Sequence, residues 1–307
     1  HFPRPDETMT TSVEREVRSV RGGLGCVDMS TLGKIEAKGP DAMAFLSRLY
    51  CNDFARLQPG RLRYALMLRE DGIVFDDGTI ARLDEDHFLV TSTTARAESV
   101  WRHMQKHHQI EWPELDLTLT RASDHWASLA IAGPEARGLL VALAPDFATS
   151  AEELPFASVR EGLLGGDLPA RVFSVSFSGE LSYEINVPAG FAEVLWQRVM
   201  RSGAQWDITP YGLEALDVLR IEKGHLAVGT EIDGRRVPGD YGLSSMVSTQ
   251  KDFIGRALLT RPALQAERRA QLVGLRPVDG TTMIPVAAHL TETPLSETKL
   301  PTSQGYL

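Results

Sequence analysis

Two adjacent acids, Asp76 and Asp77, lie in a segment whose alternating pattern predicts a β-strand over residues 73–83. Alternation places the two acids on opposite faces of that strand. The predicted face of Asp77 also carries Ile73, Phe75, Thr79 and Ala81. An aspartate with apolar neighbours is either held by structural hydrogen bonds or positioned for chemistry on a ligand. Burial would raise its pKa from about 3.9, whereas nearby donors or cations would lower it. The residues alone favour the structural role for Asp77.

Tyr64 and Glu184 are further polar candidates whose neighbours do not settle a role. Tyr64 lies on a predicted strand at 63–68, which a turn at 69–72 joins to the strand of Asp77. By itself it is best explained as a half-buried strand tyrosine. Glu184 lies in SFSGELSYEI, residues 176–185, and would ordinarily be solvated.

Residues 211–224 predict a helix that ends at Gly224. Its apolar stripe consists of Leu213, Ala215, Leu216, Val218 and Leu219. Helical geometry places Glu222 in the middle of this apolar arc, and a buried carboxylate needs a partner because an unpaired buried charge is costly. For Arg220 and Glu222, an ion pair that ties the helix to neighbouring strands explains the R-x-E spacing at least as well as contact with a ligand.

Other motifs do not predict a metal, nucleotide or nucleophile site. His103 and His107 have i, i+4 spacing, but their charged neighbours favour a solvated helix face. RGGLG at 21–25 lacks the third glycine and the preceding strand of a dinucleotide fingerprint. Neither a P-loop nor a GxSxG elbow is present. Cys26 and Cys51 are too few for a disulfide framework or a multi-cysteine metal site, so we expect no metal.

Length and composition are those of an ordinary globular protein. The chain has 307 residues, of which 43% are hydrophobic and 24% charged. Its net charge of −9 argues against non-specific nucleic-acid binding. No apolar run approaches the ~18 residues of a membrane helix. Residues 1–15 lack the apolar core of a secretory signal, so the cytoplasm is the predicted location.

One pattern of elements is predicted twice. The first copy consists of a strand at 32–37, the pair Gly39-Pro40 and a helix at 41–50. Residues 127–143 repeat the same order of strand, Gly-Pro pair and helix. Two copies are too few for a solenoid. They indicate an internal pseudo-repeat, with two similar α+β units around one core.

The remaining elements are predicted less regularly. Further helices are expected at 14–26, 94–107 and 189–202, and strands within 155–177 and at 272–278. The tail at 279–307 is rich in Thr, Pro and Ser, and we expect much of it to be irregular. Because the chain begins at His1 rather than methionine, we expect a fragment of a longer polypeptide.

Several ordered blocks resemble one family. RIEKGH at 220–225, followed by GTEIDG and KDFIG, is similar to the folate-binding domain of heterotetrameric sarcosine oxidase alpha subunits, within the aminomethyltransferase (glycine-cleavage T-protein) family. The segments at 27–53, 63–83, 129–137 and 176–185 fit the family in the same order, so the resemblance covers about residues 14–277. It implies an α+β, T-protein-like folate-binding fold, with two related α/β units around a central ligand site. It also implies a domain at 1–255 and a truncated C-terminal β-barrel domain at 256–307.

The resemblance also implies site residues. The matching positions are Asp77 as the catalytic acid, and Tyr64, Asp77, Phe177, Glu184 and Arg220 as contacts to the cofactor tetrahydrofolate. The sequence departs from the family in three places: Asp71-Gly72 replaces a glycine pair, Phe177 replaces a ligand-contacting tyrosine, and Leu216 replaces an arginine. The last departure argues against a conventional T-protein and fits the sarcosine-oxidase branch.

The function implied is capture of a one-carbon unit as 5,10-methylenetetrahydrofolate. A flavin-bearing oxidase subunit would oxidise a small-molecule donor, sarcosine or a similar N-methyl amine. Flavin and NAD are expected only on other domains or subunits, and Asp77 would accept or relay a proton, or hold the developing cation. Two alternatives stay open. One is a folate-dependent aminomethyltransferase or demethylase acting on another N-, O- or S-methyl substrate, and the other is a non-catalytic folate-binding or assembly module.

Overall fold

The computed structural model describes all residues except 145–149, 267–268, 286, 293–302 and 307. The α-helices are α1 (Met9–Gly22), α2 (Ala42–Leu49), α3 (Ala97–Lys106), α4 (Ala136–Leu143), α5 (Ala192–Gly203), α6 (Leu213–Lys223) and α7 (Arg256–Leu259). The strands are β1 (Gly25–Asp28), β2 (Gly33–Lys38), β3 (Arg61–Leu68), β4 (Val74–Asp84), β5 (His87–Ser92), β6 (Thr118–Arg121), β7 (Trp126–Ala132), β8 (Ser158–Leu164), β9 (Leu168–Ser174), β10 (Ser182–Pro188), β11 (Thr209–Pro210), β12 (His289–Thr291) and β13 (Ser303–Tyr306).

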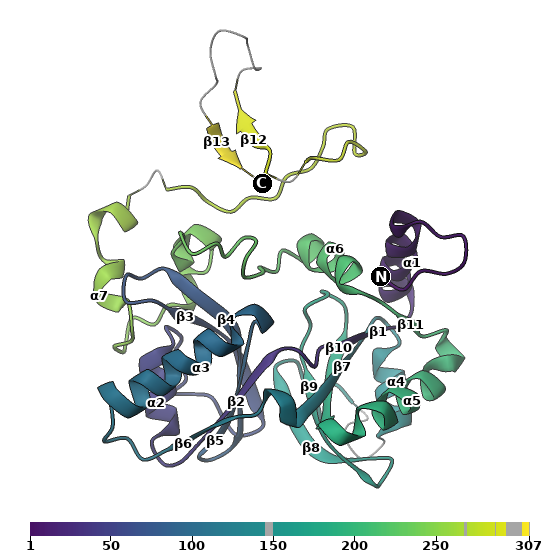
Figure 1. Cartoon of the computed structure of the whole chain (residues 1–307), viewed down its shortest axis with the longest axis horizontal. Helices are drawn as coiled ribbons and strands as arrows, with labels where there is room; N and C mark the ends of the chain where they lie inside the picture. The colour runs from purple at the N-terminus through teal and green to yellow at the C-terminus, as the bar shows by residue number, and fades with distance from the viewer. Residues whose placement is uncertain (145–149, 267–268, 286, 293–302, 307) are drawn as a thin grey trace.

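Eleven of these strands form one continuous sheet with the order β11-β1-β7-β10-β9-β8-β3-β4-β5-β2-β6. Its two halves have the same element order: β2-α2-β3-β4-β5-α3 in one and β7-α4-β8-β9-β10-α5 in the other. They join where Arg61 of β3 pairs with Ser158 of β8. In Figure 1 they lie side by side, with α2 and α3 on one half and α4 and α5 on the other.

Each half has its own apolar core beneath its helices. One core joins α2 and α3 to buried side chains such as Ile35, Ala65 and Ile80. The other joins α4 and α5 to Ile131 and Ile185. Since strand side chains alternate, the opposite faces of the same strands are left to meet in the middle of the molecule, where the polar candidates lie.

The repeated Gly-Pro pairs have a shared conformational reason. Gly39 and Gly133 have φ angles of 143° and 126°, which a side chain would strain. A Cβ at Gly39 would lie 2.6 Å from the Asp116 carbonyl oxygen, and one at Gly133 would lie 2.3 Å from that of Gly23. Each strand can therefore turn into its helix only through glycine.

The predicted position of Glu222 is wrong. On α6 the buried residues are Ala215, Leu216, Leu219 and Arg220. Leu213 is 69% exposed and the Glu222 side chain 54% exposed, with its carboxylate paired to Arg21 of α1. The reason is that α6 buries only a narrow stripe, displaced from the arc that its leucines suggest.

The strand predicted at 272–278 is also wrong. No strand is formed there, and Leu272, Val273 and Val278 are exposed. An apolar run needs a partner strand, and the described part of the chain pairs none with this one. The tail beyond it contributes a short hairpin, β12–β13, which stands away from both halves in Figure 1. None of the helices described is long and apolar enough to cross a membrane.

Candidate functional site

Tyr64 on β3 and Asp77 on β4 lie on neighbouring strands of one hairpin. The register pairs Leu66 with Asp77 and Tyr64 with Thr79, which places both candidates on the same face of the sheet. The Tyr64 hydroxyl donates to Asp77 Oδ2 at 2.6 Å. The Thr93 hydroxyl, which follows β5, donates to Oδ1 at 3.3 Å. Each carboxylate oxygen of Asp77 therefore has one neutral donor.

A β-bulge changes the alternation that was predicted for this strand. Met67 pairs with Asp76 but Leu68 pairs with Val74, so Phe75 is an extra residue. Val74 then joins the cluster of Leu68, whereas Phe75 packs on the opposite face. The prediction that Phe75 shares the face of Asp77 is therefore wrong. Opposite faces for Asp76 and Asp77 are confirmed.

Burial dominates the electrostatics of Asp77. It raises the pKa of the Asp77 carboxyl, and the hydrogen bonds from Tyr64 and Thr93 oppose that rise. Burial, followed by the Asp77 charge, raises the pKa of Tyr64 far above its usual range. Tyr64 thus stays protonated as a donor, and Asp77 is a carboxylate whose proton affinity is increased.

Asp76 has a different environment although it is adjacent in sequence. It is 2% exposed, its Oδ2 accepts from the Thr93 backbone N–H at 3.3 Å, and among the described residues its Oδ1 has no hydrogen-bond partner. Burial and the nearby Asp77 charge raise the pKa of Asp76 to about 8. At neutral pH Asp76 is therefore mostly protonated.

Replacing Asp76 with asparagine is expected to make the protein more stable at high pH. The pKa of Asp76 is about 8 when folded and about 3.9 when unfolded. Between these values the folded state holds a proton that the unfolded state releases, so wild-type stability falls as pH rises. Asparagine is neutral throughout, so the melting temperature of Asp76→Asn should exceed that of the wild type by a few degrees at about pH 9 and match it near pH 4.

Thermal unfolding across this pH range measures the effect. Asp84→Asn is the matched control, because Asp84 ends the same strand but is exposed. Parallel pH curves for wild type and Asp76→Asn would contradict the assignment.

Glu184 lies on β10, paired with Ala130 of β7 and Phe173 of β9. Its neighbour Tyr183 belongs to the core under α4 and α5, so Glu184 faces the middle of the molecule instead of bulk solvent. Burial raises the pKa of Glu184, and the charge of Lys34 opposes the rise. Within the described residues, no side chain donates a hydrogen bond to its carboxylate. Glu184 is therefore only partly exposed, and less solvated than the residues alone suggest.

Arg220 and Phe177 line one pocket at α6. Arg220 is 2% exposed, and its guanidinium donates to Asp217 Oδ1 at 2.6 Å, Glu231 Oε2 at 2.7 Å and the His225 carbonyl at 3.1 Å. The Phe177 ring stacks on the His225 imidazole, 5.7 Å between centroids. The pocket has a volume of about 390 Å³, and its other lining residues are Leu213, Glu214, Leu216, Asp217 and Ala227.

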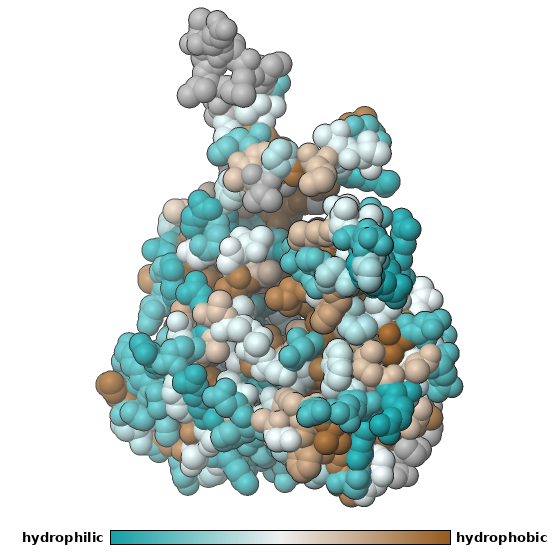
Figure 2. Space-filling model, turned by 45° about the vertical axis from the view of Figure 1, so that its right-hand side comes forward, coloured by the Kyte–Doolittle hydropathy of each residue, from teal (hydrophilic) through white to brown (hydrophobic). Residues whose placement is uncertain are grey.

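The structure thus joins Tyr64 directly to Asp77, and Phe177 to Arg220 through one pocket. In the described part of the chain no hydrogen bond links one pair to the other. Figure 2 turns the α1 and α6 side forward and shows hydrophobic residues gathered in the middle of that face.

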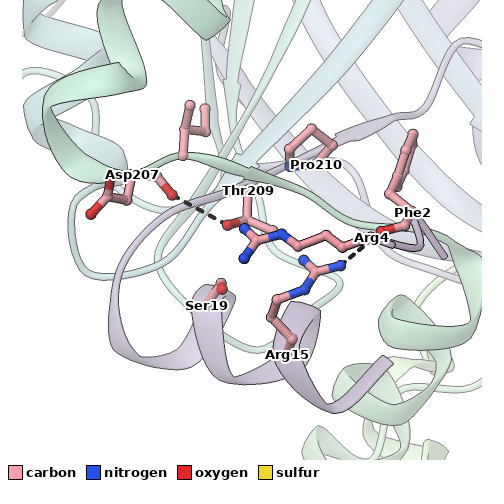
Figure 3. Close-up of a pocket in the computed structure, with 8 residues that line it drawn as sticks. Phe2, Arg4, Arg15, Ser19, Asp207, Thr209 and Pro210 are labelled. Carbon is pink, nitrogen blue, oxygen red and sulfur yellow. Dashed lines mark hydrogen bonds between the residues drawn. The ribbon is translucent and has the colours of Figure 1, made fainter. Parts of the chain in front are cut away.

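A larger pocket holds none of these residues. It has a volume of about 560 Å³ and lies between the N-terminal segment, α1 and β11 (Figure 3). Arg15 in its wall is already paired with Glu7 at 2.7 Å. In the described ranges, no group of three or more His, Cys, Asp or Glu side chains could hold a metal ion.

Two polar residues near the candidates were missed by sequence reasoning. Thr93 contacts both acids, and Lys34 is the cation that acts on Glu184. The only local indication of burial for Lys34 is its position between Gly33 and Ile35, which are themselves buried in the strand. Thr93 has no signal, because its role depends on the packing of β5 beside β4.

Comparisons with known proteins agree with the fold. The GCVT N-terminal domain family matches residues 1–251. The chain is 46% identical over 309 residues to "Sarcosine oxidase subunit alpha" of Rhizobium meliloti (strain 1021), covering 100% of this chain and 31% of that protein. It is 32% identical over 259 residues to an aminomethyltransferase of Thermotoga petrophila, covering 84% of this chain and 69% of that protein.

A solved structure has the same architecture. The glycine cleavage system aminomethyltransferase T from Bartonella henselae matches with a TM-score of 0.70 and 26% identity, over 80% of this chain and 65% of that one. The fold is thus that of an aminomethyltransferase-type α/β domain. The chain belongs to the GCVT family, as its resemblance predicted, and it spans about a third of the length of the sarcosine oxidase subunits it matches.

Proposed function

We propose that this chain is the tetrahydrofolate-binding domain of a sarcosine oxidase-type complex, and that it captures a one-carbon unit as 5,10-methylenetetrahydrofolate. The observation that carries the proposal is the partly buried Asp77 carboxylate with the Tyr64 hydroxyl at 2.6 Å. The 46% identity to a sarcosine oxidase alpha subunit supports the same conclusion.

The residues present fit a reduced folate. Glu184 has a partly buried carboxylate to which no described side chain donates, and the ring of a pterin carries amino and N–H donors that one carboxylate can bind. Phe177 and Leu216 supply apolar walls at the pocket on α6. Arg220 directs its guanidinium to Asp217 and Glu231, so we propose that it shapes this pocket through the protein.

Asp77 would hold or accept a proton during transfer. Its raised pKa increases its strength as a base, and Tyr64 fixes the orientation of the carboxylate. When bound, tetrahydrofolate supplies the nitrogens that take the one-carbon unit. The protein contributes by holding both reactants near one carboxylate.

The remaining features of the proposal concern the rest of the protein. We propose that residues 1–255 form the folate domain and that 256–307, with the β12–β13 hairpin, begin a C-terminal barrel domain. A flavin-bearing subunit would oxidise the N-methyl amine, and flavin and NAD would bind outside this chain. This division agrees with a chain that spans about a third of its sarcosine oxidase relatives.

Titration calorimetry with tetrahydrofolate tests the proposal. The wild type is expected to bind, and Glu184→Gln is expected to bind about 10- to 100-fold more weakly because a charged hydrogen-bond acceptor is lost. Glu193→Gln is the control, since Glu193 is an exposed glutamate on α5. Absence of binding to the wild type would refute the proposed function.

A further inference from the structure

Lys34 is a buried cation on the central face of β2. It is 1% exposed, and its neighbours Ile35 and Ala37 belong to the core under α2, so Lys34 and Glu36 face the other half of the molecule. The Lys34 ammonium donates to the Ser30 carbonyl at 3.1 Å and the Leu32 carbonyl at 3.2 Å. An ammonium has three N–H donors, and within the described residues the third has no acceptor.

The charge of Lys34 is balanced only at a distance. Burial lowers the pKa of Lys34, and the charges of Glu184, Asp28 and Asp124 oppose that change. No carboxylate in the described part of the chain forms an ion pair with it, whereas Glu184 lacks a donor of its own. Two opposite charges therefore share a region of low dielectric constant, and each has unused hydrogen-bonding capacity.

The next two opposite charges along the same interface do form an ion pair. Glu36, two residues after Lys34, contacts Arg171 of β9 directly, with its Oε1 2.7 Å from Arg171 Nη1. Arg171 pairs in register with Asn186, two residues after Glu184. The halves can thus bring opposite charges into contact at this interface. They leave Lys34 and Glu184 without an ion pair, although Lys34 is buried and Glu184 partly buried, and a buried charge without a partner is costly.

We propose that Lys34 and Glu184 bind one edge of the same ligand, with Lys34 donating to a carbonyl oxygen and Glu184 accepting from the adjacent N–H donors. The inference rests on the proposed function, because the pterin ring of tetrahydrofolate presents a carbonyl beside an N–H and an amino group. Lys34 is then a specificity-determining residue for the oxo form of the ring. A ligand with an amino group in place of the carbonyl oxygen would bind less tightly, because its N–H groups would face the N–H groups of the Lys34 ammonium.

The test measures ligand preference by calorimetry. The two ligands are tetrahydrofolate and its diamino analogue, in which a ring amino group replaces the carbonyl oxygen. The wild type should prefer tetrahydrofolate by about 10- to 100-fold, the scale of one hydrogen bond to a charged donor. Lys34→Met should weaken tetrahydrofolate binding by a similar factor and bring the ratio of the two affinities close to one. Lys38→Met, at an exposed position of β2, should change neither.

The outcomes separate this inference from the proposed function. If the wild type binds neither ligand, the proposed function fails. If it binds both equally, or if folded Lys34→Met keeps the wild-type ratio and affinity, only the role of Lys34 is overturned. The wild-type ratio needs no variant, so the inference can be refuted even if Lys34→Met does not fold.

Discussion

Replacing Asp77 with asparagine is expected to lower the rate of methylene transfer by roughly 10²–10⁴, with little change in tetrahydrofolate affinity. Asparagine has nearly the same shape, and its amide oxygen can still accept the hydrogen bond from Tyr64. It cannot take a proton, however. A function that depends on Asp77 as a base should be lost while the binding site persists.

The rate should be measured as methylenetetrahydrofolate formed in a single turnover, in the full-length subunit assembled with its flavin-bearing partner. Calorimetry on the same variant shows whether binding is retained. Asp84→Asn on the same strand is the matched control and should behave as the wild type. Wild-type product yield from Asp77→Asn would exclude Asp77 as the base. Tetrahydrofolate binding without product formation in the wild type would instead favour the non-catalytic folate-binding module.

Much of the architecture around Asp77 could be predicted from local sequence. The hairpin of β3 and β4 follows from alternating residues on either side of a turn, and the two Gly-Pro pairs follow from a backbone that only glycine allows. These signals are local, because a strand or a tight turn depends mainly on residues close in the chain.

Pairing between distant segments accounts for what could not be predicted. The bulge at Phe75 depends on the register between β4 and β3, and nothing in the sequence of β4 alone requires it. From the sequence of its strand Lys34 would be expected to be exposed, and its burial depends on packing against distant segments. The predicted position of Glu222 was wrong for the same reason, since the face of α6 that is buried depends on where α1 packs.

This dependence on packing also decides how Arg220 should be interpreted. Its place in RIEKGH suggested either a ligand contact or an ion pair within the protein. In the folded chain its donors are directed at Asp217, Glu231 and the His225 carbonyl. A guanidinium whose donors are already bonded has little capacity left for a ligand. We therefore expect the main effect of removing it to be on stability.

Arg220→Met is expected to reduce the free energy of unfolding by about 3 kcal/mol, because it leaves Glu231 partly buried without its cation. This is the lower end of the usual range, since water reaches Glu231 and Asp217. Denaturant unfolding measures the change, and Arg198→Met, which breaks an exposed pair with Asp167, should reduce stability much less.

The double variant Arg220→Met/Glu231→Gln separates structure from binding. Replacing Glu231 as well should recover part of the lost stability, because it removes the partly buried unpaired carboxylate, whereas the Asp217 carboxylate that remains is largely exposed to water. If Arg220 only supports the pocket, the double variant should bind tetrahydrofolate nearly as tightly as the wild type under conditions where both are folded. If stability recovers while affinity stays at least tenfold lower, Arg220 contacts the ligand itself, and the ion pairs with Asp217 and Glu231 serve to hold it in place for that contact.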